Sequence, residues 1–322
     1  MTYFPSRSTV LTGLAAAVAG AAVPRNARAQ NATLRIAGVY SDLFAEPFYV
    51  KEAGAFAKAG FDIEANSLNN AGAVAAAIGG GALELGTGDL VSGVNAINAG
   101  VPIVLIAGGG MYRERTDGVS TILAVANDSP IRTPKDMIGK TVGVPTLVGM
   151  TTACVRAWLP AHGVPETSVR FVEIPPSAAL PALLHGTLDI GMLSEPFVTF
   201  GAGQVRSVGS PYDIAADHAA NKEFCVSVWY ANKDWFVADP ARSRRVVQAI
   251  YDTARWANGH RDETFGILVR DGHLDPDKAR GMLRTTYATS LTPALVQPVL
   301  DIAMQYKFFT KQVDAATLIT KA

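Results

Sequence analysis

Short apolar runs alternate with amphipathic segments along most of the chain, a pattern typical of strands alternating with helices. Residues 33–39 form the first apolar run, and Pro47 suits the start of a helix expected over 48–59, before Gly60. The series continues as strand 61–65, helix 70–78, strand 83–86, a helix from Asp89 as its cap to Asn98, and strand 101–107. This order predicts a parallel sheet with helices on both faces.

A glycine-rich and charged segment over 108–118 interrupts this pattern and indicates passage into a second lobe. The second series is expected as strands 120–126, 140–144, 168–174, 188–193 and 205–208, with helices 150–161, 177–185 and one from Pro196. The run 224–231 is expected as a strand that returns to the first lobe. We therefore predict an α/β fold of two doubly wound lobes joined by two crossing strands, with residues 31–118 and 224–322 in lobe one and 119–223 in lobe two with the hinge strands.

The last quarter of the chain has helical periodicity. Helices are expected over 240–258, 262–269, 275–287 and 292–304, with polar starts at Asp239, Asp275 and Thr292. We expect this C-terminal helical extension to pack on the outside of lobe one.

Residues 1–30 resemble a signal peptide. Arg7 precedes an apolar stretch over 10–23, which is shorter than the roughly 20 residues that a membrane-spanning helix needs. The segment Ala27-Arg28-Ala29 has the small-x-small pattern of a cleavage site, and no cysteine stands there to carry a lipid. We predict export to the periplasm, with the Sec and twin-arginine routes both open.

Charge and cysteine content exclude some classes of partner. The chain has 28 basic and 28 acidic residues, without the basic runs interleaved with aromatics that nucleic-acid binding favours. Export permits a disulfide, but Cys154 and Cys225 are expected to be two separate buried thiols.

Common catalytic patterns are absent from the sequence. It contains no HExxH, GxSxG, GxxxxGK[ST] or CxxC, and its histidines are scattered rather than paired at metal spacing. We therefore expect no enzyme activity, no metal and no cofactor.

Polar or aromatic loops follow five of the expected strands. They are Tyr40-Ser41-Asp42, Asn69-Asn70-Ala71, Gly86-Thr87-Gly88-Asp89, Pro145 to Thr152, and Ser194-Glu195-Pro196. Ligands of open α/β sheets bind at the carboxyl ends of the strands. Two such lobes facing each other predict a cleft that closes by hinge motion around a small molecule.

Three stretches of the sequence carry a resemblance to a known family. They are residues 46–56 running into 60–63, residues 132–144 (RTPKDMIGKTVGV), and residues 186–191 followed by Ser194-Glu195-Pro196-Phe197. Here the chain resembles the periplasmic binding proteins for sulfonates, nitrate and thiamine-precursor pyrimidines, a branch of the type II periplasmic binding proteins. The likeness covers about residues 33–304.

The resemblance implies that the loops after the five strands face the solute. The candidate ligand-binding residues are Tyr40, Ser41, Phe44, Asn69, Asn70, Thr87, Asp89, Met150, Thr151, Ser194, Glu195 and Trp229. Tyr40 and Phe44 would either stack on the ligand or pack within the lobe. Asn69 and Thr87 would form hydrogen bonds either to the ligand or within local turns and caps.

The remaining candidates have similar alternatives. The N–H groups at the start of the helix over 150–161 would hold an anionic group, unless Thr151 only caps that helix. Glu195 would accept from an amine or ring N–H, or hydrogen-bond backbone at a helix start. Trp229 would border the cleft or pack at the hinge. The scarcity of basic residues in the loops favours an organic, partly aromatic solute over a small inorganic anion.

The resemblance implies a monomeric receptor that delivers a small molecule to the permease and ATPase of an ABC importer. Two alternatives remain at this point: an enzyme of the pyrimidine-forming or chorismate-dehydrating type on the same scaffold, and a sensor-input protein that docks on a membrane kinase. Sulfonate, nitrate, pyrimidine and aromatic acid all remain possible solutes.

Overall fold

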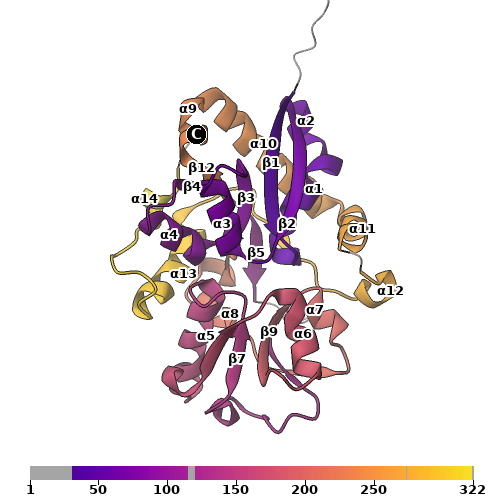
Figure 1. The fold of residues 1–322 in the computed structure, drawn as a ribbon, viewed down its shortest axis with the longest axis vertical. Helices are drawn as coiled ribbons and strands as arrows, with labels where there is room; N and C mark the ends of the chain where they lie inside the picture. The colour runs from indigo at the N-terminus through magenta and orange to yellow at the C-terminus, as the bar shows by residue number, and fades with distance from the viewer. Residues whose placement is uncertain (1–30, 115–119, 273, 321–322) are drawn as a thin grey trace, which may run out of the picture. The chain divides into compact units, whose positions relative to one another are not determined.

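The computed structural model describes residues 31–114, 120–272 and 274–320. Two five-stranded sheets organise this part of the chain, and a three-stranded sheet links them. We call the parts built on the two larger sheets lobe one and lobe two. Figure 1 shows the first part of lobe one in indigo and purple, the part of the chain that returns to it in orange, and lobe two in magenta and pink. The predicted signal peptide lies outside the described residues.

The sheet of lobe one has the order β2-β1-β3-β12-β4. Its strands are β1 (Ala32–Val39), β2 (Phe61–Leu68), β3 (Leu85–Asp89), β4 (Ile103–Gly108) and β12 (Ser227–Asn232). β1 is parallel to β2 and β3, but β12 is antiparallel to both β3 and β4. The four strands of the predicted series therefore run parallel to one another, and the returning strand β12 inserts between β3 and β4 in the opposite direction.

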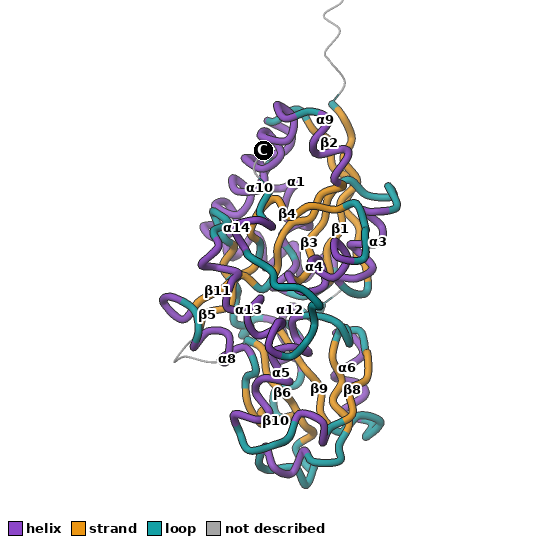
Figure 2. The backbone as a smooth tube through the Cα atoms, turned by 90° about the vertical axis from the view of Figure 1, so that its left-hand side faces the viewer, coloured by secondary structure: helices purple, strands orange, loops and turns teal. Residues whose placement is uncertain are grey.

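The sheet of lobe two has the order β10-β6-β9-β7-β8. Its strands are β6 (Thr121–Ala126), β7 (Thr141–Val144), β8 (Arg170–Glu173), β9 (Ile190–Ser194) and β10 (Val205–Gly209). β7 is parallel to β8 and β9, whereas β6 is antiparallel to β9 and β10. Figure 2 shows this group of strands apart from those of lobe one.

Antiparallel strands connect the lobes. β5 (Gly110–Arg113) pairs with β11 (Glu223–Cys225) and with β13 (Thr286–Tyr287). The return segment expected as one strand is thus two, because its first part pairs with β5 and its second part enters the sheet of lobe one. The predicted class, two α/β lobes joined by crossing strands, is confirmed.

Helices cover the sheets of both lobes. They are α1 (Glu46–Ala53), α2 (Ala55–Lys58), α3 (Ala71–Gly79), α4 (Leu90–Asn98), α5 (Met150–Ala161), α6 (Pro176–Leu184), α7 (Phe197–Phe200), α8 (Tyr212–Asp217), α9 (Lys233–Ala238), α10 (Pro240–Gly259), α11 (Arg261–Asp271), α12 (Pro276–Ala279), α13 (Pro293–Gln305) and α14 (Ala315–Leu318). Short 3-10 turns are η1 (Asp42–Phe44), η2 (Pro134–Met137), η3 (Glu166–Ser168) and η4 (Ala220–Lys222). Within the described residues, none of the helices combines the length and apolar content needed to cross a bilayer.

Two predicted helices differ from the structure. The helix expected over 48–59 is divided at Gly54, whose φ of 67° is a left-handed conformation that ends α1. The helix expected over 275–287 is wrong, because Asp275 caps only the single turn of α12 and the following chain leads into β13.

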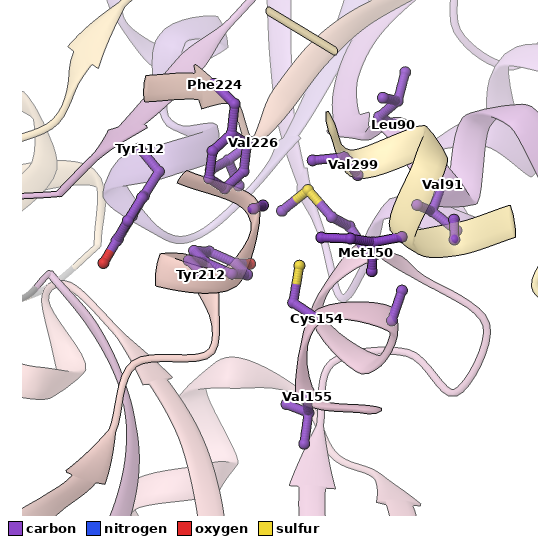
Figure 3. Packing of buried hydrophobic residues seen from close by; sticks show 14 of the residues in the cluster. Leu90, Val91, Tyr112, Met150, Cys154, Val155, Tyr212, Phe224, Val226 and Val299 are labelled. Carbon is purple, nitrogen blue, oxygen red and sulfur yellow. The ribbon is translucent and has the colours of Figure 1, made fainter. Parts of the chain in front are cut away.

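The C-terminal extension does not pack only on lobe one. α10 packs against α1 and α2 as expected, but α13 packs against α4 of lobe one and α5 of lobe two. One cluster of buried apolar side chains consequently runs from lobe one through Val299 of α13 to Met150 and Cys154 of lobe two (Figure 3). Cys154 and Cys225 are both buried and free, which confirms the prediction of separate thiols.

A buried ion pair fixes the segment between α12 and β13. Arg284 Nε lies 3.0 Å from Asp42 Oδ1, and the two side chains are only 12% and 2% exposed. Asp42 Oδ2 also accepts from Thr285 N at 2.6 Å, and Tyr287 Oη donates to the carbonyl of Asp42 at 2.5 Å. Thus η1 of lobe one holds the chain that enters the linking sheet.

We predict that Asp42→Ala lowers the free energy of unfolding by about 3–5 kcal/mol, because it leaves the Arg284 charge buried without its partner. Asp277→Ala is the control, since Asp277 and its partner Arg280 are 87% and 75% exposed. The control should cost less than about 1 kcal/mol. Urea denaturation measures both, and equal losses in the two variants would contradict this interpretation.

Candidate functional site

A pocket lies where the carboxyl ends of strands from both lobes meet. The described residues that line it are Val39, Ser41, Phe44, Asn70, Ala71, Asp89, Pro145, Thr146, Thr151, Pro176, Met192, Ser194 and Tyr212. Its volume is about 550 Å³, including space open to solvent.

Hydrogen bonds between the lobes surround the pocket. Ser41 Oγ donates to the carbonyl of Glu195 at 3.3 Å, and Asn70 Nδ2 donates to Glu173 Oε1 at 3.2 Å. Met150 N donates to Asp89 Oδ1 at 2.9 Å. Lobe one supplies Ser41, Asn70 and Asp89, which also line the pocket, so the same residues both bring the lobes together and face the enclosed space.

Asp89 caps two helices at once. Its Oδ1 accepts from Ser92 N in the first turn of α4 and from Met150 N at the start of α5, both at 2.9 Å. Its Oδ2 accepts from Ser92 Oγ at 2.6 Å. The N-terminus of a helix carries a partial positive charge, so two helix ends from different lobes stabilise this one carboxylate. Burial raises the pKa of Asp89, and the hydrogen bonds from Ser92 and Met150 oppose that rise.

Gly149 makes this approach possible. It is the N-cap residue of α5 and has no side chain with which to cap the helix. A Cβ atom there would lie 2.0 Å from Thr146 Oγ1, 3.1 Å from Ser92 Oγ and 3.3 Å from Asp89 Oδ2. The glycine therefore leaves room for a carboxylate from the other lobe to cap the helix in its place.

The walls of the pocket are mainly apolar. Phe44 and Val39 come from lobe one, and Met192 from lobe two. Thr151 Oγ1 and Tyr212 Oη are hydrogen-bonded to each other at 3.0 Å. Among the described lining residues there is no lysine, arginine or histidine, and Asp89 is the one carboxylate.

Several predicted site residues line this pocket, namely Ser41, Phe44, Asn70, Asp89, Thr151 and Ser194. Asn70 has a second role, because its Oδ1 accepts from Ala73 N and caps α3. Ser194 Oγ is hydrogen-bonded to Thr121 Oγ1 at 3.1 Å. That these residues contact a ligand remains a prediction.

Tyr40, Asn69 and Thr87 do not line the pocket. The Tyr40 hydroxyl donates to the carbonyl of Leu268 in α11, and its ring packs on Phe48, so the lobe-packing alternative holds. Thr87 is fully buried and donates to the carbonyl of Phe44 at 3.0 Å. Asn69 is exposed.

Met150 and Glu195 act at the lobe boundary without lining the pocket. The Met150 side chain is fully buried among Val91, Cys154 and Val299 (Figure 3), and only its N–H contributes to the site. Glu195 accepts hydrogen bonds from Thr199 N and Thr199 Oγ1 in α7 and from Leu283 N. Its side chain thus hydrogen-bonds protein groups at a helix start, which is the second of the two alternatives given for it.

Trp229 is buried in the core of lobe one rather than at the cleft. Its ring is fully buried on β12, and its Nε1 donates to Glu46 Oε2 at 2.8 Å. Glu46 is fully buried too, and its Oε1 has no hydrogen-bond partner among the described residues. Burial raises the pKa of Glu46 well above its ordinary value, and the bond from Trp229 only partly opposes that shift.

Five of the described lining residues lie outside the predicted loops, namely Val39, Phe44, Pro176, Met192 and Tyr212, although Phe44 was itself a candidate. Pro176 begins α6 after β8, so the expectation that ligands bind at the carboxyl ends of strands could have indicated it. Met192 lies within β9, two residues before Ser194, and strand alternation could have indicated it. Tyr212 begins α8, a helix that was not predicted from the sequence. No sequence pattern indicates that this helix packs beside α5.

Two α/β lobes with a pocket between them define the architecture of the type II periplasmic binding proteins. The structure is similar to the alkanesulfonate-binding protein SsuA of Xanthomonas axonopodis pv. citri bound to MOPS, with a TM-score of 0.73 and 14% identity over 91% of this chain and 100% of that one. It is also similar to the nitrate-binding protein NrtA of Synechocystis PCC 6803, with a TM-score of 0.67 and 13% identity over 89% and 85% of the two chains. These likenesses establish the fold.

The sequence assigns the chain to a family. The model of the family described as NMT1/THI5 like matches residues 44–264, and the chain belongs to this family. The chain is also 26% identical, over 180 residues, to the bicarbonate transport ATP-binding protein CmpC of Synechocystis, and this match spans 49% of the chain but only 26% of that protein.

The environment of Glu46 predicts a pH-dependent effect of Glu46→Gln. Glutamate ordinarily titrates near 4.5, and the folded protein retains the proton of Glu46 to higher pH. Folding therefore takes up a proton above pH 4.5, and this group lowers the stability of the folded state as pH rises. The glutamine variant cannot ionise, so its stability relative to the wild type should increase from pH 5 to pH 8 in urea denaturation.

The control for this experiment is Glu64→Gln, which removes a carboxylate from an exposed position on β2. It should show no comparable gain between the two pH values. If the stability difference between Glu46→Gln and the wild type is the same at both, then Glu46 does not take up a proton on folding.

Proposed function

We propose that this chain is a periplasmic receptor that binds a small organic molecule between its lobes and delivers it to the permease and ATPase of an ABC importer. The observation that carries the proposal is the pocket whose rim is formed by hydrogen bonds from one lobe to the other, at Ser41, Asn70 and Asp89. Membership in the NMT1/THI5-like family and the shared fold with SsuA and NrtA support it.

The mechanism would be a shift between open and closed forms. A solute held by Phe44 and Asn70 of lobe one and by Thr151 and Ser194 of lobe two gains its full set of contacts only when the lobes are closed. Binding therefore favours the closed form, which we propose that the permease recognises. We further propose that the receptor acts as a monomer.

The test is to purify the protein, release any bound small molecule by mild denaturation, and identify it by mass spectrometry. Adding the identified solute back to the stripped protein should raise the melting temperature and lower the radius of gyration measured by X-ray scattering, because the closed form is selected. If no released molecule and no compound of a broad metabolite panel produces both changes, the receptor proposal fails.

The two neighbouring asparagines provide a matched pair of variants. Asn70→Ser keeps an oxygen that can cap α3 but removes the amide that reaches Glu173 of lobe two. We expect the affinity for the solute to fall about tenfold, which corresponds to the loss of a hydrogen bond to a charged group. Asn69→Ser changes an exposed side chain outside the pocket and should leave the dissociation constant unchanged in calorimetric titration. Equal effects of both variants would contradict the role of Asn70 in closure.

A further inference from the structure

One carboxylate occupies the position where the helix of lobe two meets the pocket. Asp89 lines the pocket, is only 6% exposed, and accepts a hydrogen bond from the first N–H of α5. The N-terminus of a helix ordinarily favours an anionic partner. Here the protein supplies that partner itself, from the other lobe, and the Met150 N–H is already used.

The rest of the lining does not compensate for this charge. The described lining residues include no lysine, arginine or histidine. An anion placed in this pocket would lie close to the Asp89 carboxylate, in a site where burial limits screening by solvent and salt. No cationic side chain among the described lining residues would be available to bind that anion. A ligand group that donates an N–H differs from an anion, because it would be attracted to the Asp89 carboxylate, which accepts from donors only and already does so from Ser92 N, Ser92 Oγ and Met150 N.

From this geometry we propose that Asp89 determines specificity: it excludes anions and selects a neutral or cationic ligand that donates an N–H group to its carboxylate while its apolar part lies against Phe44 and Met192. The inference rests on the proposed function. It also separates this pocket from the ligand classes in the names of the structural neighbours, since alkanesulfonates and nitrate are anions.

Benzamidine and benzoate are suitable probes because they have nearly the same shape and opposite charge. We expect isothermal titration of the wild type to give a dissociation constant for benzamidine at least tenfold lower than that for benzoate. Methanesulfonate, compared with sodium chloride at equal ionic strength, should not raise the melting temperature.

Asp89→Asn tests the role of the charge. Its Oδ1 can still accept from Ser92 N and Met150 N, so both helix caps are retained while the negative charge is lost. The preference for benzamidine over benzoate should fall at least tenfold. Ser92→Ala is the control, because it removes one hydrogen bond to Asp89 but keeps the charge, and it should keep the preference of the wild type.

Three results would overturn the inference: binding of benzoate or methanesulfonate to the wild type as tight as that of benzamidine, an unchanged preference in Asp89→Asn, or no binding of benzamidine to the wild type. Should Asp89→Asn fail to fold, the preference of the wild type decides alone. The outcome is separable from that of the proposed function. A co-purified anion that closes the lobes would support the receptor proposal and refute the inference about Asp89. If the wild type prefers benzamidine and Asp89→Asn loses that preference, but no solute closes the lobes, the inference stands and the receptor proposal fails.

Discussion

The contact between the lobes depends on one carboxylate placed between two helix N-termini. Asp89 ends β3 and begins α4, which fixes it at the carboxyl edge of the lobe-one sheet, and it also accepts from the first N–H of α5 in lobe two. Each helix end contributes a partial positive charge, and neither lobe alone supplies both. The interaction is therefore complete only when the lobes meet, and Gly149 has no side chain that would crowd Thr146, Ser92 and Asp89 at this point.

The other contacts around the pocket follow the same principle, because each joins a strand end of one lobe to a strand end of the other. Asn70 follows β2 and reaches Glu173 at the end of β8, and Ser41 follows β1 and reaches the carbonyl of Glu195 after β9. α13 also joins the lobes, through apolar packing against α4 and α5. A solute is thus enclosed by polar contacts on the pocket side, whose partners can also be satisfied by water when the lobes open.

The sequence predicted the loops of the site, but only some of the side chains that it selected face the pocket. Val39 and Ser41 line it while Tyr40, between them, points toward α11, and Met192 and Ser194 repeat this alternation on β9. A period of two is inherent in an extended chain, but its phase depends on which face of the sheet is covered by which helix. The antiparallel insertion of β12 was likewise beyond reach, since hydrophobic pattern does not give strand direction. Trp229, for which the sequence left the cleft and hinge packing as alternatives, is carried by β12 into the core of lobe one.

The fold and the proposed ligand preference thus depend on different residues of this chain. The sheets, the crossing strands and α13 depend on many apolar positions, and a fold of this kind is shared with proteins of less than 20% identity. The charge inside the pocket depends on a single side chain, and at an effective dielectric constant near 20 two like charges 4 Å apart repel by about 4 kcal/mol, nearly a thousandfold in affinity. Under the proposed role of Asp89, Asp89→Asn would alter the charge preference of the pocket while an acceptor oxygen still caps both helices. Family membership follows the architecture, whereas the charge preference that we propose follows from Asp89.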